Sequence, residues 1–275
     1  MQECAARLST PARRDRPIPP ATRRAAVATW GAGMSVTHRY REAWEGFWGE
    51  APDEQGAVFW DADPALTAGV HLALFEPYLS AHDLPVVDLG CGNGTQTRFL
   101  ADRFRHVVGA DLSAAALEHA RLADPAGQAT YRLLDAAEKT EAQTLHAELG
   151  DANVYMRGVL HQCEPDDRQP LVDALATLVG ERGRAFLVEL SEAARPVLMG
   201  LARSSDGPPP KLAPIFRHGI APGEVSDDAV PDYLRAAGLT VLASGELPLV
   251  TTEFTPEGAR IELPSKWLVA GRTAG

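Results

Sequence analysis

The chain has 275 residues, of which 45% are hydrophobic, so it is long enough to bury a sizeable core in one large domain or two small ones. Its formal net charge of −11 argues against a nucleic-acid partner, because affinity for nucleic acid comes largely from basic groups that neutralise phosphates. Since no apolar run approaches a membrane span and the three cysteines lack the spacing of a disulfide framework or a zinc cluster, we expect a cytoplasmic protein without a membrane partner.

Residues 1–33 differ from the rest of the chain in charge. Six arginines stand against Glu3 and Asp15, which gives this segment a net charge of +4 and leaves −15 for residues 34–275. The segment is rich in Pro, Ala and Arg and has little to bury. We interpret it as a disordered basic leader, with a nucleic-acid-binding arm as the alternative, and predict a single domain over residues 34–275.

Aromatic residues are concentrated in residues 37–64. Trp44, Phe47 and Trp48 fall at the i, i+3, i+4 spacing of one helical face. Such a face must cover something: the sheet of the domain, a neighbouring subunit in a homodimer, or the functional site. We expect residues 34–84 to form an N-terminal helical lid.

The stretch VVDLGCGNGT, residues 86–95, joins an apolar strand to a helical pattern through a glycine-rich turn. Glycine is needed there because the chain must reverse tightly and bring bare backbone against a ligand. The spacing fits neither the dinucleotide-binding G-x-G-x-x-G nor a P-loop, because the third glycine comes one residue early and no lysine follows. A second strand, within residues 106–113, ends at Asp111, where a carboxylate can accept hydrogen bonds from a ribose.

Further apolar strands are predicted at residues 130–134, 152–156, 185–190, 239–243 and 266–270, mostly alternating with helical patterns. This alternation predicts an α/β fold with a doubly wound, mostly parallel sheet, and right-handed crossovers place the ligand-binding loops at one edge of it. Residues 85–275 would form this sheet core. Residues 204–224 are rich in proline and predict a flap over the site, or a disordered segment.

The Asp-x-Gly-x-Gly-x-Gly pattern of Asp88, Gly90, Gly92 and Gly94, followed at strand-two distance by Asp111, resembles the class I S-adenosylmethionine-dependent methyltransferases of the small-molecule type. The resemblance covers roughly residues 84–270 and implies a seven-stranded Rossmann-like sheet whose last strand is antiparallel. It also implies S-adenosylmethionine (SAM) as cofactor and S-adenosylhomocysteine (SAH) as product. The cofactor-binding positions that it implies are Asp88, Gly90, Cys91, Gly92, Asn93, Gly94, Asp111, Leu112, Asp135, Ala136 and Arg157.

His161 is the candidate general base, because its Arg-x-Val-Leu-His context resembles the fourth motif of small-molecule methyltransferases and follows the fourth strand. A purely structural histidine is the alternative. No Asn-Pro-Pro-Tyr follows that strand, and the carboxylates of a metal-dependent catechol methyltransferase are missing from their places, so we predict no catalytic metal. The candidate substrate contacts are Trp48, Phe59, Trp60, Phe216 and His218.

The sequence thus predicts an enzyme that methylates oxygen, nitrogen or carbon of a small, partly apolar metabolite. Three alternatives stay open: methylation of a protein or RNA through the basic leader, a cofactor-binding protein without turnover, and a NAD-dependent oxidoreductase on a similar sheet.

Overall fold

The computed structural model describes residues 36–79, 83–204 and 207–273, and gives side chains in the first helix from Tyr40 onward. Residues 1–33, where a leader was predicted, lie outside the described residues. Within the described part of the chain, no helix is both long and apolar enough to cross a membrane.

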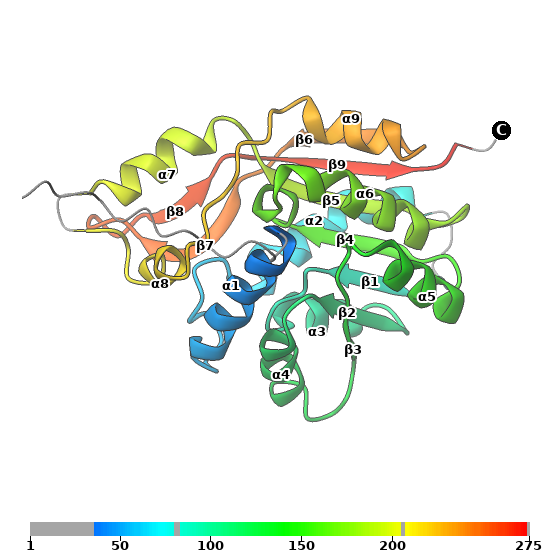
Figure 1. Ribbon diagram of the computed structural model, residues 1–275, viewed down its shortest axis with the longest axis horizontal. Helices are drawn as coiled ribbons and strands as arrows, with labels where there is room; N and C mark the ends of the chain where they lie inside the picture. The colour runs from blue at the N-terminus through cyan, green and yellow to red at the C-terminus, as the bar shows by residue number, and fades with distance from the viewer. Residues whose placement is uncertain (1–35, 80–82, 205–206, 274–275) are drawn as a thin grey trace, which may run out of the picture. The chain divides into compact units, whose positions relative to one another are not determined.

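Seven strands form the main sheet, and it has the predicted doubly wound, mostly parallel arrangement (Figure 1). In spatial order they are β3 (Thr130–Leu133), β2 (Val107–Asp111), β1 (Val86–Leu89), β4 (Asn153–Arg157), β5 (Ala185–Leu190), β9 (Ser265–Gly271) and β6 (Thr240–Glu246). The first five are parallel, and β9 inserts antiparallel between β5 and β6. The expected Rossmann-like fold with an antiparallel last strand is confirmed.

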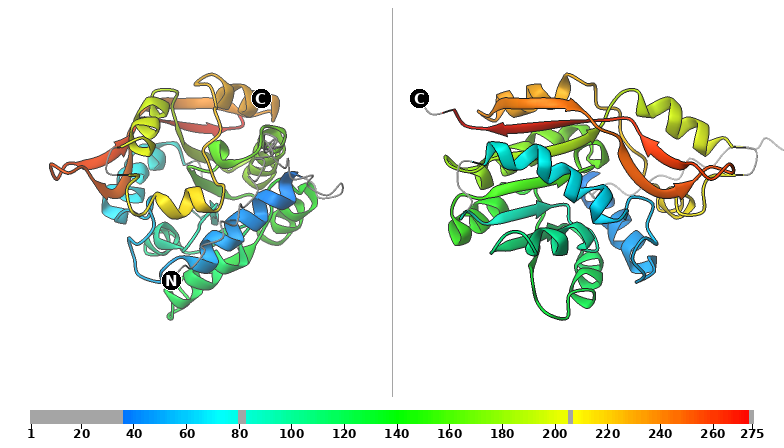
Figure 2. Two further views of the ribbon diagram at one scale, coloured as in Figure 1. Left: turned by 60° about the vertical axis from the view of Figure 1, so that its left-hand side comes forward. Right: turned by 180° about the vertical axis from the view of Figure 1, so that it is seen from behind.

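Helices cover both faces of the sheet, which explains why β1 and most of β4 and β5 are buried along their length. Alternate residues of β1 enter different cores: Val87 packs in the core that includes α5, α6 and α9, and Val86 packs in the core that includes α1, α2 and α3. Figure 1 shows α5 and α6 in front of the sheet, and the right panel of Figure 2, which views the molecule from behind, shows α2 (cyan) on the opposite face. The α-helices are α1 (Val36–Glu50), α2 (Ala68–Phe75), α3 (Thr95–Ala101), α4 (Ala114–Leu122), α5 (Lys139–Leu149), α6 (Pro165–Val179), α7 (Ala194–Ala202), α8 (Ala213–Arg217) and α9 (Ala229–Ala236). The short 3-10 helices are η1 (Pro64–Leu66), η2 (Glu76–Tyr78) and η3 (Leu160–Gln162).

Several elements were not predicted from the sequence. A separate hairpin of β7 (Leu249–Phe254) and β8 (Arg260–Leu263) occupies the turn-rich segment before the last strand. Helix α7 follows β5, and the predicted flap contains the short helix α8. The lid region, by contrast, is helical as predicted and contains α1, η1, α2 and η2.

The strand order reverses at β1, whose neighbours β2 and β4 lie on its two sides. The chain leaves the carboxyl end of β1 toward one face of the sheet and the end of β4 toward the other. Ligands of open α/β sheets bind in the crevice that this divergence creates. The glycine turn follows β1 and His161 follows β4, so both lie at this crevice.

Candidate active site

The glycine turn after β1 is shaped by left-handed backbone at Gly92 (φ 54°) and Gly94 (φ 73°). A Cβ on Gly92 would lie 2.8 Å from the indole of Trp48, so only glycine lets that ring cover the turn. Gly94 faces the other way, where a Cβ would meet Ala120 and Tyr131 at about 3 Å. Gly94 therefore does not line the cavity, and its expected cofactor contact is replaced by a packing role at the start of α3.

Asp111 lies at the end of β2 and is tied directly to the glycine turn. One carboxylate oxygen accepts the backbone N–H of Gly92 at 2.8 Å, and the other accepts that of Ser113 at 2.9 Å. Burial raises the pKa of this carboxyl, and the backbone hydrogen bonds oppose that rise. Asp111 and the turn line the same cavity, as the sequence predicted, and the bond to ribose stays a prediction.

Asp88 lies buried beneath the turn and accepts a hydrogen bond from the Thr97 hydroxyl at 2.6 Å. Burial raises the pKa of Asp88 to about 6, although the Thr97 bond lowers it. This bond joins the end of β1 to the first turns of α3, so Asp88 holds the glycine turn between two regular elements.

Asp135 follows β3 and lines the cavity together with Ala136 and Leu112. Its carboxylate accepts the backbone N–H of Ala137 at 2.9 Å and pairs with the Arg41 guanidinium of α1. The predicted contact with the adenine edge would therefore be made beside an ion pair that the sequence analysis missed.

Helix α1 holds three cofactor-side loops through one of its faces, which we call the α1 clamp: Arg41, Glu45 and Trp48. Arg41 pairs with Asp135, Trp48 covers Gly92, and Glu45 accepts the Ser113 hydroxyl at 2.7 Å. Their i, i+4, i+7 spacing is visible in the sequence and could have revealed the face. The clamp packs the aromatic helix within its own chain, and a homodimer stays a prediction.

Residues 56–61 pass along the cavity as a strap. The buried Asp61 carboxylate accepts the side-chain N–H of Asn93 at 2.9 Å, which ties the strap to the glycine turn. Arg157, at the end of β4, donates to the backbone oxygen of Trp60 at 2.7 Å. Phe59, Trp60 and Asp61 consequently line the cavity.

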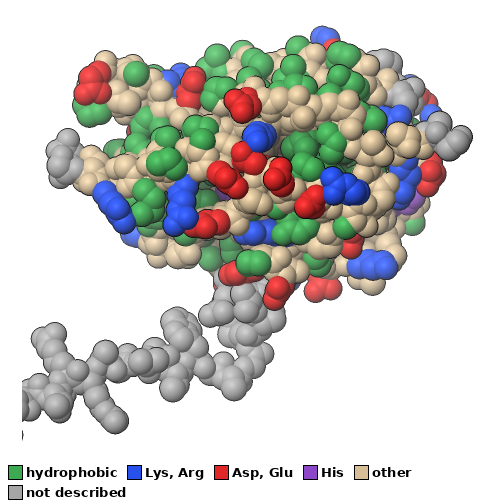
Figure 3. All heavy atoms as spheres, turned by 90° about the horizontal axis from the view of Figure 1, so that it is seen from above, with side chains coloured by type: hydrophobic (Ala, Val, Ile, Leu, Met, Phe, Trp, Pro, Cys, Tyr) green, Lys and Arg blue, Asp and Glu red, His purple; other side chains and the backbone are tan. Residues whose placement is uncertain are grey.

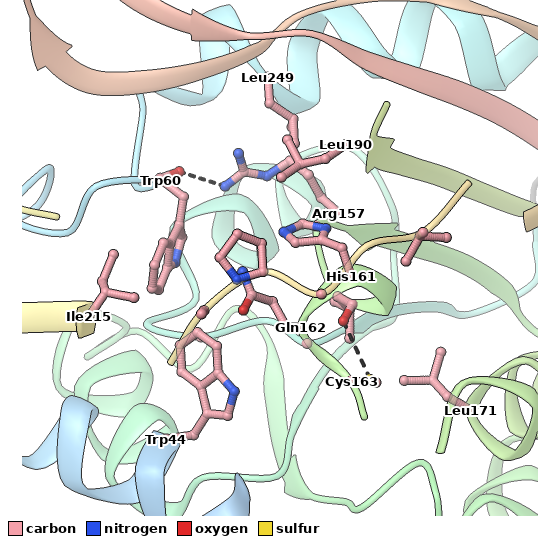
Figure 4. A pocket seen from close by; sticks show the side chains of 18 of the residues that line it. Trp44, Trp60, Arg157, His161, Gln162, Cys163, Leu171, Leu190, Ile215 and Leu249 are labelled. Carbon is pink, nitrogen blue, oxygen red and sulfur yellow. Dashed lines mark hydrogen bonds between the residues drawn. The ribbon is translucent and has the colours of Figure 1, made fainter. Parts of the chain in front are cut away.

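His161 lies in η3 after β4, and its side chain reaches the cavity (Figure 4). Its Nδ1 lies 2.7 Å from a carboxylate oxygen of Glu189, and both side chains are buried. The other Glu189 oxygen accepts the backbone N–H groups of Val159 and Leu160 at 2.9 and 2.8 Å. An ionised carboxylate only accepts, so we assign the ring proton to Nδ1, which leaves the Nε2 lone pair free to take a proton.

Glu189 is a functional candidate that sequence reasoning missed. The signal was a single acidic residue in the otherwise apolar strand β5, because a buried carboxylate needs partners.

The predicted substrate contacts separate into two groups. Trp48, Phe59, Trp60 and Phe216 line the cavity. His218 does not: its imidazole lies 3.1 Å from the Glu50 carboxylate at the end of α1 and packs edge-on against Phe47. That expectation was wrong, because the turn after α8 directs His218 toward α1.

These residues surround one cavity of about 950 Å³. Its lining includes the exposed backbone of the glycine turn, where added Cβ atoms at Gly90 and Gly92 would collide with Val159 and Trp48. The carboxylate of Asp111 stands beside that backbone. Bare peptide groups next to a strand-two carboxylate fit a nucleoside-bearing cofactor, so the residues present are suited to SAM.

The strand order, glycine turn and strand-two carboxylate together define the architecture of a class I methyltransferase. Residues 86–183 match the family described as Methyltransferase domain. The chain is similar to the crystal structure of a SAM-dependent methyltransferase from Anabaena variabilis, with 32% identity, 85% of this chain and 95% of that chain covered, and a TM-score of 0.79. The chain therefore belongs to the class I SAM-dependent methyltransferase family, and it is an enzyme that uses SAM as its cofactor.

Two more distant structures share the fold. The magnesium protoporphyrin IX methyltransferase of Synechocystis, crystallised with SAM, has 16% identity, coverage of 89% of this chain and 100% of that chain, and a TM-score of 0.56. The 1,6-didemethyltoxoflavin-N1-methyltransferase of Burkholderia thailandensis has 18% identity, coverage of 89% and 94%, and a TM-score of 0.54. A comparison with curated proteins gives no match. The family assignment sets aside the NAD-dependent oxidoreductase and the protein without turnover.

Proposed function

We propose that the enzyme methylates oxygen, nitrogen or carbon of a small, partly apolar metabolite in the cytoplasm. The cavity carries this proposal, because its volume of about 950 Å³ lies at the upper end of the range of about 300–1,000 Å³ for small-molecule sites. Such a volume supports a cofactor and a small acceptor bound together. The free cysteines Cys91 and Cys163 support a reducing compartment.

SAM supplies a methyl group on a sulfonium that is already a good leaving group, so the protein's main task is alignment. Alignment of reacting groups can lower a barrier by about 7–11 kcal/mol. The α1 clamp and the strap hold the loops that would bind the cofactor, and the part of the cavity lined by His161 is left for the acceptor.

His161 would accept the acceptor's proton at Nε2. Glu189 holds the imidazole in the required tautomer through Nδ1 and stabilises the positive charge that develops on the ring. The same carboxylate fixes the backbone at Val159 and Leu160, so the base and its loop are positioned by one side chain.

A protein or RNA acceptor, bound through the basic leader, is the alternative. On the face drawn in Figure 3, acidic and basic side chains are interspersed instead of being gathered into a basic band. The two more distant relatives are named for small-molecule substrates, magnesium protoporphyrin IX and 1,6-didemethyltoxoflavin. These observations favour a small acceptor, and a homodimer remains compatible with it.

The test replaces His161 with Gln and measures SAH formation from SAM, using separately the metabolite fraction and the macromolecular fraction of one cell extract. We expect turnover only with the metabolite fraction. His161→Gln should lower the rate about 10²- to 10⁴-fold because the proton acceptor is gone, and it should leave SAH affinity unchanged.

His146→Gln is the matched control, because His146 lies on α5, pairs with Asp151 just after that helix, and is outside the cavity. Turnover confined to the macromolecular fraction would overturn the small-molecule proposal. A His161→Gln rate equal to that of His146→Gln would remove His161 from the mechanism.

A further inference from the structure

Two sets of residues line the cavity. One set carries polar groups at the glycine turn and the loops after β2 and β3, namely the backbone of the turn and the side chains of Asn93, Asp111 and Asp135. The other is apolar and comes largely from the segments around α7, α8 and the β7–β8 hairpin: Leu190, Leu198, Met199, Leu212, Ile215, Leu249 and Leu263. Figure 4 shows His161 and Gln162 reaching into a space with Trp44 and Trp60 on one side and Leu190 and Leu249 on another. The candidate base therefore faces an apolar chamber.

One wall of this chamber is a fixed aromatic corner. The rings of Trp44 and Trp60 meet edge to face, with centroids 5.4 Å apart and planes at 69°. Tyr40 packs against Trp44 at 6.1 Å, and the buried Phe47 supports Trp60 from behind at 5.4 Å. Flat faces held in this way complement a flat ring, because aromatic pairs prefer offset or edge-to-face contacts at about 4.5–7 Å.

The charges around the cavity disfavour an anionic acceptor. Seven carboxylates line it against four arginines. Each arginine already donates to a protein acceptor: Arg41 to Asp135, Arg157 to the Trp60 carbonyl, Arg168 to the Glu224 carbonyl and Arg195 to the Glu224 carboxylate. Four of the seven carboxylates belong to the cofactor side of the cavity: Asp61, Asp88, Asp111 and Asp135. A carboxylate or phosphate on the acceptor would therefore have to compete with the protein groups that the arginines already bind.

From the aromatic corner, the charge balance and the His161–Glu189 pair, we propose that the acceptor is a neutral, planar aromatic molecule with a ring O–H or N–H. This inference rests on the proposed small-molecule function and deepens it. The ring oxygen or nitrogen forms the bond to the methyl carbon, and the methyl–sulfur bond breaks with its electron pair going to sulfur. The O–H or N–H proton goes to Nε2 of His161, so a neutral methylated ring and SAH result.

Three probe molecules that share one carbon skeleton test the class. 2-Naphthol is neutral and planar, decahydro-2-naphthol is its saturated counterpart, and 6-hydroxy-2-naphthoate adds a negative charge. Each is titrated by calorimetry into the full-length protein saturated with SAH. We expect 2-naphthol to bind about tenfold more tightly than either of the others, the difference that one good aromatic contact or one charge mismatch provides.

Two variants of Trp60 test whether the aromatic corner causes the preference for 2-naphthol. Trp60→Leu should reduce the advantage of 2-naphthol over the saturated alcohol to about twofold, Trp60→Phe should restore most of it, and SAH affinity should be unchanged in both. Phe254→Leu is the matched control, since Phe254 is an exposed aromatic residue of β7 outside the cavity. It should retain the full advantage.

The possible outcomes distinguish a failure of this inference about the acceptor from a failure of the proposed small-molecule function. Equal or tighter binding of decahydro-2-naphthol or of the naphthoate overturns the aromatic, neutral class, as does failure of all three to bind when SAH does. The small-molecule function is then still judged by which extract fraction yields SAH. A preference for 2-naphthol that Trp60→Leu leaves intact would overturn the role of the aromatic corner.

Discussion

At the end of β2, a single carboxylate joins two parts of the site that lie far apart in sequence. Asp111 accepts one backbone N–H from the glycine turn and one from the residue before α4. The turn is therefore held against β2 before any cofactor arrives. Such preorganisation reduces the cost of ordering the loops on binding.

Asp111→Asn should weaken SAH binding about 10- to 100-fold, because hydrogen bonds to a charged group contribute about 1.5–3 kcal/mol and the amide keeps only one acceptor oxygen. Calorimetric titration with SAH measures the change. Asp124→Asn is the matched control: Asp124 also accepts two backbone N–H groups, from Gln128 and Ala129, but lies outside the cavity. Wild-type affinity in Asp111→Asn would refute the ribose assignment.

At the scale of the element, α1 acts through the face that carries the clamp. Glu45 accepts from the Ser113 hydroxyl and from the Ala115 backbone at the start of α4, where a negative charge is also favoured by the helix dipole. The helix that covers the site thus also caps the helix that follows Asp111. We infer that ordering of α1 and ordering of the ribose-side loop are coupled.

Glu45→Ala should speed hydrogen exchange in α1 about two- to fivefold and weaken SAH binding by a similar factor, because an exposed charge at a helix N-terminus contributes about 0.3–1 kcal/mol. Mass-spectrometric exchange with and without SAH measures both effects. Glu118→Ala, at an exposed position on α4, should change neither. If α1 exchanges as in wild type while SAH affinity falls, the coupling is wrong and Glu45 acts only as a cap.

Much of the sheet could be predicted because β1, β2 and β5 are short, largely apolar and buried runs. Strand β5 was predicted with its observed bounds. The hairpin of β7 and β8 was not predicted because β8 has only four residues and β7 places the polar Thr251 at a buried position, although burial alternates along β8 and the first half of β7.

The site was predictable where chemistry and spacing lie close together in sequence, as in the glycine turn and Asp111. Glu189 could not be paired with His161, because nothing local specifies which residue of a distant strand will face a given loop. The prediction that His218 contacts the substrate failed for the same reason. Phe216, two residues earlier, lines the cavity, but the direction of the His218 side chain depends on its contact with α1.

At the scale of the whole molecule, His71 ties the layer containing α2 to the sheet. Its Nδ1 lies 2.7 Å from the Tyr155 hydroxyl of β4, and both side chains are buried. Burial lowers the pKa of His71 from 6.5 to about 3, with a smaller contribution from Arg157. The folded protein therefore holds this imidazole neutral at pH values where the unfolded chain would protonate it.

The stability that His71 contributes is complete above pH 6.5, and it is lost as the pH falls from 6.5 toward 3, because only the unfolded state then binds the proton. The loss should approach about 1.4 kcal/mol per pH unit. Asp88 has the opposite effect on the free energy of unfolding, because its raised pKa favours the folded state as the pH falls through 6. The effect of His71 is therefore measured as the difference between two proteins that both contain Asp88. Urea unfolding of wild type and His71→Asn at several pH values should show a stability difference that is largest at pH 7 and shrinks below pH 6. His106→Asn, at an exposed histidine, should follow the wild-type profile, and a difference for His71→Asn that stays constant with pH would contradict a neutral buried imidazole.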